Sequence, residues 1–580
     1  MEFTPKSGSW IAAACVLWSE VAFAGVSISF EGIDAELQGA VRAHLQLQQY
    51  ADRDISRAQV NRLFAAADEE IRQALQPYGY YHAQVEKDLE RGEARGDYRA
   101  SFRITLGEAV VVAEVQLDIS GDAAQVPAVR DAVAAFRPIA GEPLHHGVYE
   151  GSKSTIATAL QTSGYFDAKL TQHRVAVTLA ENRADIGLAW DSGERYRFGA
   201  VQFSDAQFAD KFLRRYVPWS EGEFYSTEQL MTLQQRLVDA DYFATVAVQP
   251  DLERAASGVV PIEALLIPAK RTIYSAGVYV STDAGPGVRF GADRRWINSQ
   301  GHKLGGKVEY SQRLQETSLN YKIPKPGLRN RNYTFAAGYR DEETDTSTSR
   351  TSRLAVSEVL DRWHGYTRTL GLQYLNGDFT IADEQRVSSL LFAEGMLTRK
   401  RVDNVMFPDR GTSVTYGLRF APEGLLSDTS FAQLRAEARW IRPALEHSRL
   451  ILRAALGAMV VQDFDALPPE LRFFAGGDRS VRGFDYQQIG ETNATGGVIG
   501  GKFLAVASTE YEHYFTEKWG AAVFVDAGDA YSSSFEANVG AGIGVRWRSP
   551  VGIVRLDVAV PVVTELDRGL RVHINIGPDL

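Results

Sequence analysis

Residues 414–420 read VTYGLRF, and residues 434–440 read LRAEARW. Apolar and polar residues alternate in both stretches, and residues 369–374 show the same pattern. Successive side chains of a β-strand point to opposite faces, so each stretch predicts a strand with one apolar face and one polar or charged face. Many such strands in one chain are typical of a barrel with lipid outside and a polar interior. The alternative, a soluble β-sandwich, would have to enclose many arginines and carboxylates.

The length of the patterned region indicates the size of the barrel. A tilted membrane strand takes roughly 9–11 residues, so at roughly 19 residues per strand and connection, residues 272–580 accommodate about 16 strands. An even number of strands places both ends of the barrel on one side of the membrane. We therefore predict an outer-membrane β-barrel over residues 271–580, embedded in the lipid bilayer, with both ends in the periplasm.

The first 24 residues have the layout of a secretory signal peptide. Lys6 precedes an apolar run over residues 10–18, and residues 22–24 (AFA) form a small-x-small cleavage site. The run is shorter than the roughly 20 residues that span a membrane. Cleavage before Cys15, as in a lipoprotein, is an alternative that leaves almost no apolar run. Cys15 is the only cysteine, so cleavage after Ala24 leaves a chain without thiols, which suits an oxidising compartment.

A unit of about 80 residues is repeated three times before the barrel, over residues 25–107, 108–192 and 193–270. In each unit an amphipathic helix precedes a short aromatic turn, which is followed by a strand; the turns are residues 79–81 (GYY), 164–166 (GYF) and 241–243 (DYF). This order predicts α+β units with helices over a small sheet. Such units resemble POTRA domains, the periplasmic modules of outer-membrane assembly proteins. Their sheet edges could accept an extended client strand, or the units could serve as rigid spacers.

A loop over residues 476–486 (GGDRSVRGFDY) carries a candidate site. Glycines on both sides allow close backbone approach, which predicts that the loop folds into a confined space. Burial of Arg482 in such a space would require a carboxylate partner. Asp526 lies on the same strand face as Phe524, and we predict an Arg482–Asp526 contact in the lumen, with Glu510 as a second candidate acceptor. The alternative is an exposed loop.

Several motifs together resemble the BamA/TamA superfamily; they are residues 407–411 (FPDRG), 481–484 (VRGF), 524–528 (FVDAG) and 544–552 (GVRWRSPVG). Three repeats, residues 281–286 (STDAGP) and the ending at 576–580 (IGPDL) point to the TamA branch. The resemblance implies that Val481, Arg482, Gly483 and Phe484 dock on the barrel wall beside Asp526. It also implies insertion or translocation of β-rich outer-membrane proteins, such as autotransporters, with an inner-membrane-anchored TamB-like partner on the first POTRA unit.

The last predicted strand closes the barrel against the first strand, near residues 273–280. Gly577 and Pro578 lie at the end of this last strand. Because proline donates no ladder hydrogen bond and glycine weakens a strand, we expect a weak seam between the last and first strands. The resemblance implies that this seam opens sideways and releases clients into lipid. Ordinary fraying at a chain end is the alternative. The predicted seam residues are Ile273, Gly277, Ile574, Ile576, Gly577 and Pro578, with Gly277 expected close to Ile574 or a neighbour of Ile574.

Other function classes fit the sequence poorly. The net charge of −11 and a pI near 5.6 argue against nucleic-acid binding. The sequence has neither a Gly-x-Ser-x-Gly elbow nor a His-Glu-x-x-His motif, so we expect no catalytic residues, no metal and no cofactor. A two-partner secretion transporter and a passive outer-membrane pore remain the alternative functions.

Overall fold

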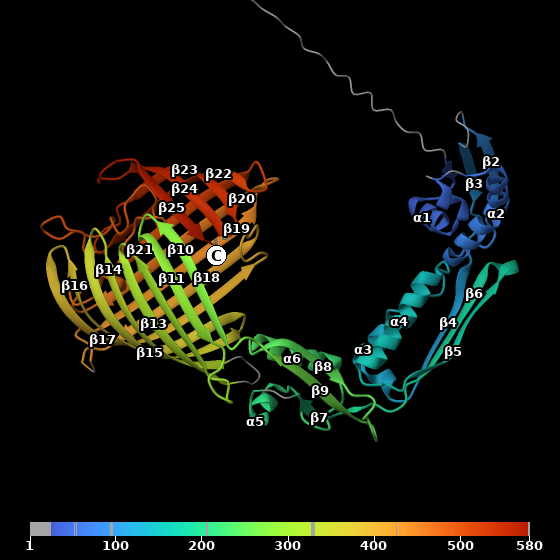
Figure 1. Cartoon of the computed structure of the whole chain (residues 1–580), viewed down its shortest axis with the longest axis horizontal. Helices are drawn as coiled ribbons and strands as arrows, with labels where there is room; N and C mark the ends of the chain where they lie inside the picture. Colours follow the sequence, from blue (N-terminus) through green and yellow to red (C-terminus); the bar gives the residue numbers. More distant parts are fainter. Residues whose placement is uncertain are drawn as a thin grey trace, which may run out of the picture. The chain divides into compact units, whose positions relative to one another are not determined.

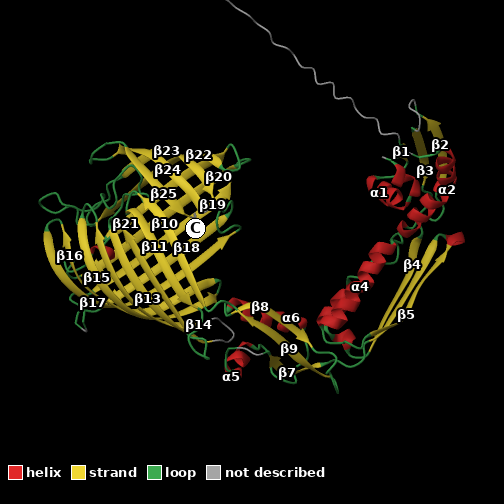
Figure 2. Cartoon of the chain, in the orientation of Figure 1, coloured by secondary structure: helices red, strands yellow, loops and turns green. Residues whose placement is uncertain are grey.

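The computed structural model describes residues 25–577, except residues 52, 54, 93–96, 205–206, 326–330, 425 and 551. The predicted signal peptide and Pro578 lie outside the described residues. The chain forms two compact units, one holding the first two repeats and the other holding the barrel with much of the third repeat. Figure 1 labels the elements along the chain, and Figure 2 separates the helices from the strands.

Each repeat folds as a three-stranded sheet with helices. The third strand in the sequence lies in the middle, so the sheet orders are β1-β3-β2, β4-β6-β5 and β7-β9-β8. The strands of the first repeat are β1 (Val26–Glu31), β2 (Gln84–Arg91) and β3 (Tyr98–Thr105), those of the second are β4 (Val111–Ser120), β5 (Lys169–Thr178) and β6 (Arg183–Asp191), and those of the third are β7 (Arg197–Phe203), β8 (Phe243–Pro250) and β9 (Val259–Pro268).

The helices follow from apolar spacing and capping. In the longest helix, α2, Ser56 accepts a hydrogen bond from the Gln59 amide at the N-terminus, and Val60, Ala67 and Ile71 are buried on one face. The helix bounds are α1 (Ala35–His44), α2 (Arg57–Leu75), α3 (Pro127–Ala134), α4 (His146–Thr162), α5 (Asp210–Leu213) and α6 (Thr227–Asp239). No described helix is long and apolar enough to cross a membrane.

Sixteen antiparallel strands, β10 to β25, close into a barrel within the described part of the chain, which confirms the predicted fold class. Leu418 and Phe420 are 55% and 54% exposed on its outer face, whereas Arg419 between them pairs with Glu394 at 2.8 Å. The strands are β10 (Thr272–Ser281), β11 (Gly285–Arg294), β12 (Lys303–Ser311), β13 (Leu314–Lys325), β14 (Arg331–Glu343), β15 (Ser347–Trp363), β16 (Tyr366–Ile381), β17 (Glu384–Val402), β18 (Gly411–Ala421), β19 (Phe431–Pro443), β20 (Ser448–Val461), β21 (Phe503–Tyr514), β22 (Trp519–Tyr531), β23 (Asn538–Ser549), β24 (Gly552–Val563) and β25 (Arg571–Gly577).

The segment between α6 and β8 contacts the turn between β11 and β12, and both belong to the same compact unit. The Tyr242 hydroxyl donates to the Gly301 carbonyl at 2.5 Å, and the Lys303 ammonium donates to the Ala240 carbonyl at 2.7 Å. Burial raises the pKa of Tyr242, which keeps this hydroxyl protonated as a donor. Gly301 has φ +71°, and a Cβ there would lie 2.7 Å from the Tyr242 hydroxyl. These contacts join the third repeat to the barrel rim.

Candidate functional site

The long loop between β20 and β21, residues 462–502, folds back into the barrel. Val481 and Phe484 have no exposed surface, and Arg482 is only 3% exposed. Val481 and Phe484 belong to an apolar core that includes Phe392 and Phe473. Burial of these two apolar side chains favours the docked loop, because each removes apolar surface from water.

Arg482 meets three carboxylates of the barrel wall. Its Nε and Nη2 donate to the two oxygens of Asp526 at 2.7 and 3.0 Å, and its backbone amide donates to the same group at 3.0 Å. Its Nη1 donates to Glu510 at 2.7 Å and to Asp557 at 3.0 Å. The structure therefore brings Arg482, Asp526 and Glu510 together, with Asp557 as a further acceptor. Such charge-assisted, bidentate contacts fix both the position and the orientation of the loop.

Two glycines create the space for this docking. Gly483 in the loop has φ +97°, which side-chain-bearing residues rarely adopt. Gly540 on β23 faces the loop backbone, and a Cβ there would lie 1.9 Å from the Arg482 carbonyl oxygen. A side chain at position 540 would therefore clash with the docked loop.

A second buried arginine, Arg546 on β23, ties the wall together. It donates to Glu510 at 2.7 Å, to Glu512 at 2.8 Å and to Asp557 at 2.5 Å. Glu512 also pairs with Arg449 at 2.6 Å. The motif at residues 544–552 contains Arg546, but sequence reasoning gave neither Arg546 nor Asp557 a role. Both residues lie on the polar face of a strand in which apolar and polar residues alternate, and this pattern could have identified them as luminal.

Asp478, on the same loop, bridges the first and last strands. Its carboxylate accepts from the Ser281 and Thr282 hydroxyls at 3.0 and 2.6 Å, at the end of β10. On β25, the His573 Nδ1 lies 2.8 Å from the carboxylate, while the His573 Nε2 accepts from the Gly483 amide at 2.9 Å. Because Nε2 accepts, Nδ1 carries the proton that is donated to Asp478. Sequence reasoning missed this role of Asp478.

The seam between β10 and β25 is short. Among the described residues, Ser281 and Asn575 form the only paired position between the two strands, and the Ile574 amide donates to the Thr282 hydroxyl at 3.2 Å. The expected proximity of Gly277 and Ile574 is wrong, because this register places Ile574 beside Thr282. The strand alternation defines which face a residue occupies, but it does not define the register of closure.

The other predicted seam residues lie at different points along the two strands. Ile273 is near the start of β10, away from the paired position, and its recorded strand partner is Asp293 on β11. Ile576 and Gly577 pair with β24, opposite Val554 and Ile553. Pro578 lies outside the described residues.

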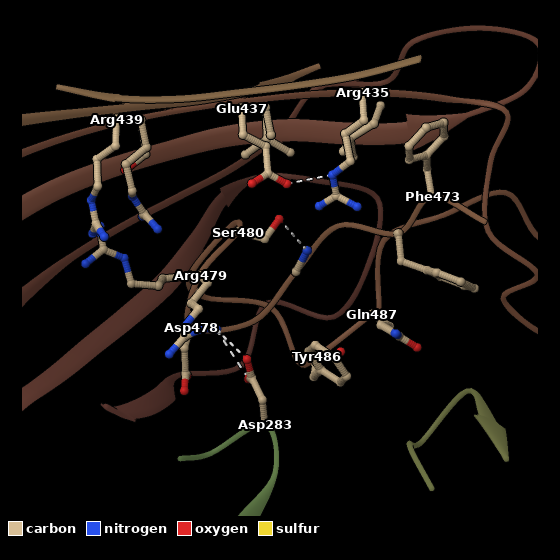
Figure 3. A pocket seen from close by; sticks show the side chains of 18 of the residues that line it. Asp283, Arg435, Glu437, Arg439, Phe473, Asp478, Arg479, Ser480, Tyr486 and Gln487 are labelled. Carbon is tan, nitrogen blue, oxygen red and sulfur yellow. Dashed lines mark hydrogen bonds and ion pairs between the residues drawn. The ribbon is translucent and has the colours of Figure 1, made fainter. Parts of the chain in front are cut away.

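Between the loop and the wall lies a cavity of about 870 Å³ with many charged lining residues. Figure 3 shows Arg435 and Glu437 of β19 on one side of it, joined by an ion pair of 2.6 Å. Asp283 lies on the other side and accepts from the Asp478 amide at 3.2 Å. The loop thus leaves a polar space inside the barrel.

These features define a class of protein: an outer-membrane barrel whose lumen receives a loop and which is preceded by POTRA-type domains. The model of the Omp85 superfamily domain matches residues 279–579, which is more than half of the chain. The chain therefore belongs to the Omp85 superfamily. The model "POTRA domain TamA domain 1" matches residues 27–106, and "Surface antigen variable number repeat" matches residues 196–261. The barrel lies in the outer membrane and the POTRA domains lie in the periplasm, as predicted.

Two relatives illustrate the similarity. The outer membrane protein assembly factor BamA of Nitratidesulfovibrio vulgaris is 28% identical over 187 residues, which cover 31% of this chain and 23% of that protein. The match therefore spans under a quarter of the relative. The crystal structure of BamA from Haemophilus ducreyi lacking POTRA domains 1–3 has a TM-score of 0.56 and 15% identity, covering 96% of this chain and 99% of that chain. This likeness establishes a shared fold.

Proposed function

We propose that the protein is the outer-membrane component of a TamA-type translocation and assembly module. In this role it inserts or translocates β-rich outer-membrane proteins, such as autotransporters, through lateral opening of the β10–β25 seam. Membership of the Omp85 superfamily and the TamA-type match of the first POTRA domain support the proposal. Assembly by the BamA of Nitratidesulfovibrio vulgaris, which its name states, is consistent with it.

The seam is the observation that carries the proposal. Within the described residues, β10 forms ten residue pairs with β11 but one with β25, while β25 forms seven with β24. A strand edge without a continuous partner presents unpaired backbone donors and acceptors, and the lipid has no hydrogen-bonding groups to pair with them. A client strand that pairs with β10 would satisfy these groups, and the client would enter the bilayer as it folds.

The loop can release the seam while it stays attached to the barrel wall. Opening the seam must break the bonds of Asp478 on at least one side, to Thr282 or to His573, and each such bond to a carboxylate contributes about 1.5–3 kcal/mol. The Arg482–Asp526 anchor need not break, because the acceptors of the Arg482 side chain lie on β21, β22 and β24. Client pairing would replace the lost bonds.

Photo-crosslinking in living cells tests this function. A photoreactive residue at Val278 of β10, which is 84% exposed, is expected to form client adducts, as is one at Ile574 of β25. The matched control is Leu418 of β18, which is 55% exposed on the outer face. Equal adducts at Leu418, or none at Val278 and Ile574, would contradict the proposal. A passive pore instead predicts steady conductance in planar bilayers without any client.

A photoreactive residue in the lumen distinguishes lateral release of the client from passage of the client through the barrel. A two-partner secretion transporter sends its client through the lumen, and a photoreactive residue at Glu437, which lines the cavity, would then give the main adduct. Lateral insertion predicts that adducts at Val278 exceed those at Glu437. The reverse order would favour the transporter.

The first POTRA domain is the proposed docking site for the TamB-like inner-membrane partner. Its strand β2 lies at the edge of the sheet β1-β3-β2, where an extended segment can add as a further strand. A photoreactive residue at Asp88, exposed on β2, is expected to capture the partner, whereas one at Glu36, exposed on α1, is not. Capture only at Glu36 would place docking on the helical face instead.

A further inference from the structure

Strand β17 carries two arginines on the outer face of the barrel. Its residues 395, 397, 399 and 401 share one face, because successive side chains of a strand point to opposite sides. Gly395 pairs with Leu418 of β18, which is exposed on the outer face. Arg399 and Arg401 therefore point toward the lipid and not into the lumen.

These two arginines lie at the periplasmic rim. Neighbouring barrel strands are antiparallel, so the turns that follow β11 and β17 lie at the same end of the barrel. The third POTRA repeat contacts the turn after β11 at Gly301, and the POTRA domains lie in the periplasm. Arg399 and Arg401 are among the last residues of β17, which places them at the level of the phospholipid headgroups of the periplasmic leaflet.

Two further arginines share this face, and few carboxylates balance the group. The register of β14 to β17 places Arg331 of β14 and Arg368 of β16 on the outer face as well. Both bind Glu358, at 3.1 and 3.0 Å. Among the described residues, no carboxylate forms an ion pair with Arg399 or Arg401. The four arginines, here called the rim cluster, therefore carry an excess of positive charge on a surface that lipid covers.

Aromatic side chains support the rim cluster. The guanidinium group of Arg368 lies 5.6 Å from the ring centroid of Trp363, and that of Arg399 lies 5.5 Å from the ring centroid of Tyr366. Tryptophan and tyrosine are typical of the membrane–water interface, where headgroups meet acyl chains. Leu418 is exposed on the same face, farther from the rim. The surface thus offers positive charge to a headgroup and apolar area to the acyl chains attached to it.

We propose that the rim cluster binds an anionic phospholipid of the periplasmic leaflet. Arg399 and Arg401 hold its phosphate, because a planar guanidinium group donates to two phosphate oxygens at once. Arg331 and Arg368 add positive charge next to this headgroup, and the acyl chains lie against Leu418. A basic cluster favours a headgroup with net negative charge over a zwitterionic headgroup. The proposal goes beyond the assembly function, because it depends neither on the opening of the seam nor on a client.

Native mass spectrometry of the full chain in micelles of a neutral detergent resolves bound lipids and tests this site. The protein is titrated with phosphatidylglycerol or with phosphatidylcholine of the same acyl chains, since these two lipids differ in headgroup charge. We expect phosphatidylglycerol to bind saturably and about tenfold or more tightly than phosphatidylcholine. Added salt should reduce this preference, because salt screens exposed charges.

Substitutions in the rim cluster test the residues. Arg399→Gln and Arg401→Gln are each expected to weaken phosphatidylglycerol binding about fivefold, and the double variant about 25-fold, because each basic residue near a headgroup contributes about fivefold. Arg399→Lys keeps the charge without the planar fork and should weaken binding less than Arg399→Gln. Arg386→Gln is the matched control, because Arg386 lies near the other end of β17 and pairs with Glu384 at 3.0 Å. Gel mobility without heating verifies that each variant barrel is folded.

Each outcome decides for or against the site. Tighter binding of phosphatidylglycerol that is lost in the double variant and kept in Arg386→Gln supports a phospholipid site at the periplasmic rim. Equal affinity for the two lipids, or equal phosphatidylglycerol affinity in the double variant and in Arg386→Gln, would overturn the proposal. Soluble glycerol phosphate that displaces the lipid at an equal concentration would also overturn it, because the acyl chains would then contribute nothing.

Discussion

The loop that enters the barrel meets two regions of contrasting construction. On the wall, β21 and β22 form twelve residue pairs, and Arg482 is buried against Asp526, Glu510 and Asp557. At the seam, the described parts of β10 and β25 share one residue pair, and side chains supply the other contacts.

The contacts of Arg482 on the wall are costly to break, whereas the contacts of Asp478 at the seam can be replaced. Removing one partner of a buried ion pair costs about 3–5 kcal/mol, because the other charge stays buried and unpaired. A hydrogen bond to a charged group, such as those that the Asp478 carboxylate accepts at the seam, contributes about 1.5–3 kcal/mol, and water or a client can replace it. One loop can therefore stay anchored on the wall while it releases the seam.

Breaking the anchor should have the largest effect. Arg482→Ala leaves the buried carboxylates of Asp526, Glu510 and Asp557 without this cation and is expected to destabilise the docked loop by about 3–5 kcal/mol. Limited proteolysis of the loop should become much faster. Arg482→Lys keeps the charge without the bidentate geometry and should give an intermediate rate. Proteolysis of Arg482→Ala at the wild-type rate would show that the loop is held by its apolar residues alone.

Filling the space behind the anchor should have the next largest effect. Gly540→Ala places a Cβ 1.9 Å from the Arg482 carbonyl, so the loop must shift, at a cost of about 1–3 kcal/mol. Gly277→Ala is the matched control, because no atom lies within 4 Å of its added Cβ. Unfolding in urea, followed by gel mobility, should show a loss for Gly540→Ala and none for Gly277→Ala. Equal behaviour would contradict the close approach.

Loosening the seam should cost no more stability than Gly540→Ala does. Asp478→Ala removes the acceptor shared by Thr282 and His573 and is expected to cost about 1–3 kcal/mol. Spin labels at Val280 and Ile576 should show a broader, longer distance distribution. Asp463→Ala, an exposed acid elsewhere in the loop, serves as the control and should leave the distribution unchanged. An unchanged distribution in Asp478→Ala would mean that strand pairing alone closes the seam.

The smallest effect is expected at the rim. Tyr242→Phe removes the hydrogen bond to the Gly301 carbonyl and should cost about 0.5–1.5 kcal/mol. Hydrogen exchange in the turn between β11 and β12 should rise modestly, while exchange at the wall stays constant. No change in the turn would show that packing alone holds this contact.

The sequence was enough to predict the barrel and one half of the loop site. Alternation from Val414 to Phe420 defines faces without any tertiary information, and a buried arginine requires an acid, which led to Asp526. The contacts of Asp478 with Thr282 and His573 were missed because they depend on the path of the loop between distant segments. The prediction that Gly277 lies beside Ile574 was wrong for a related reason: the register of β25 against β10 depends on the geometry of the whole barrel.

A disulfide across the seam tests the central claim most directly. Ser281→Cys with Asn575→Cys joins the one paired position of β10 and β25, and Val278→Cys with Val288→Cys joins β10 to its permanent neighbour β11. The account predicts that oxidation stops client assembly in the first variant, that reduction restores it, and that the second variant assembles clients in both states. Full client assembly with the Ser281–Asn575 disulfide formed would contradict lateral opening.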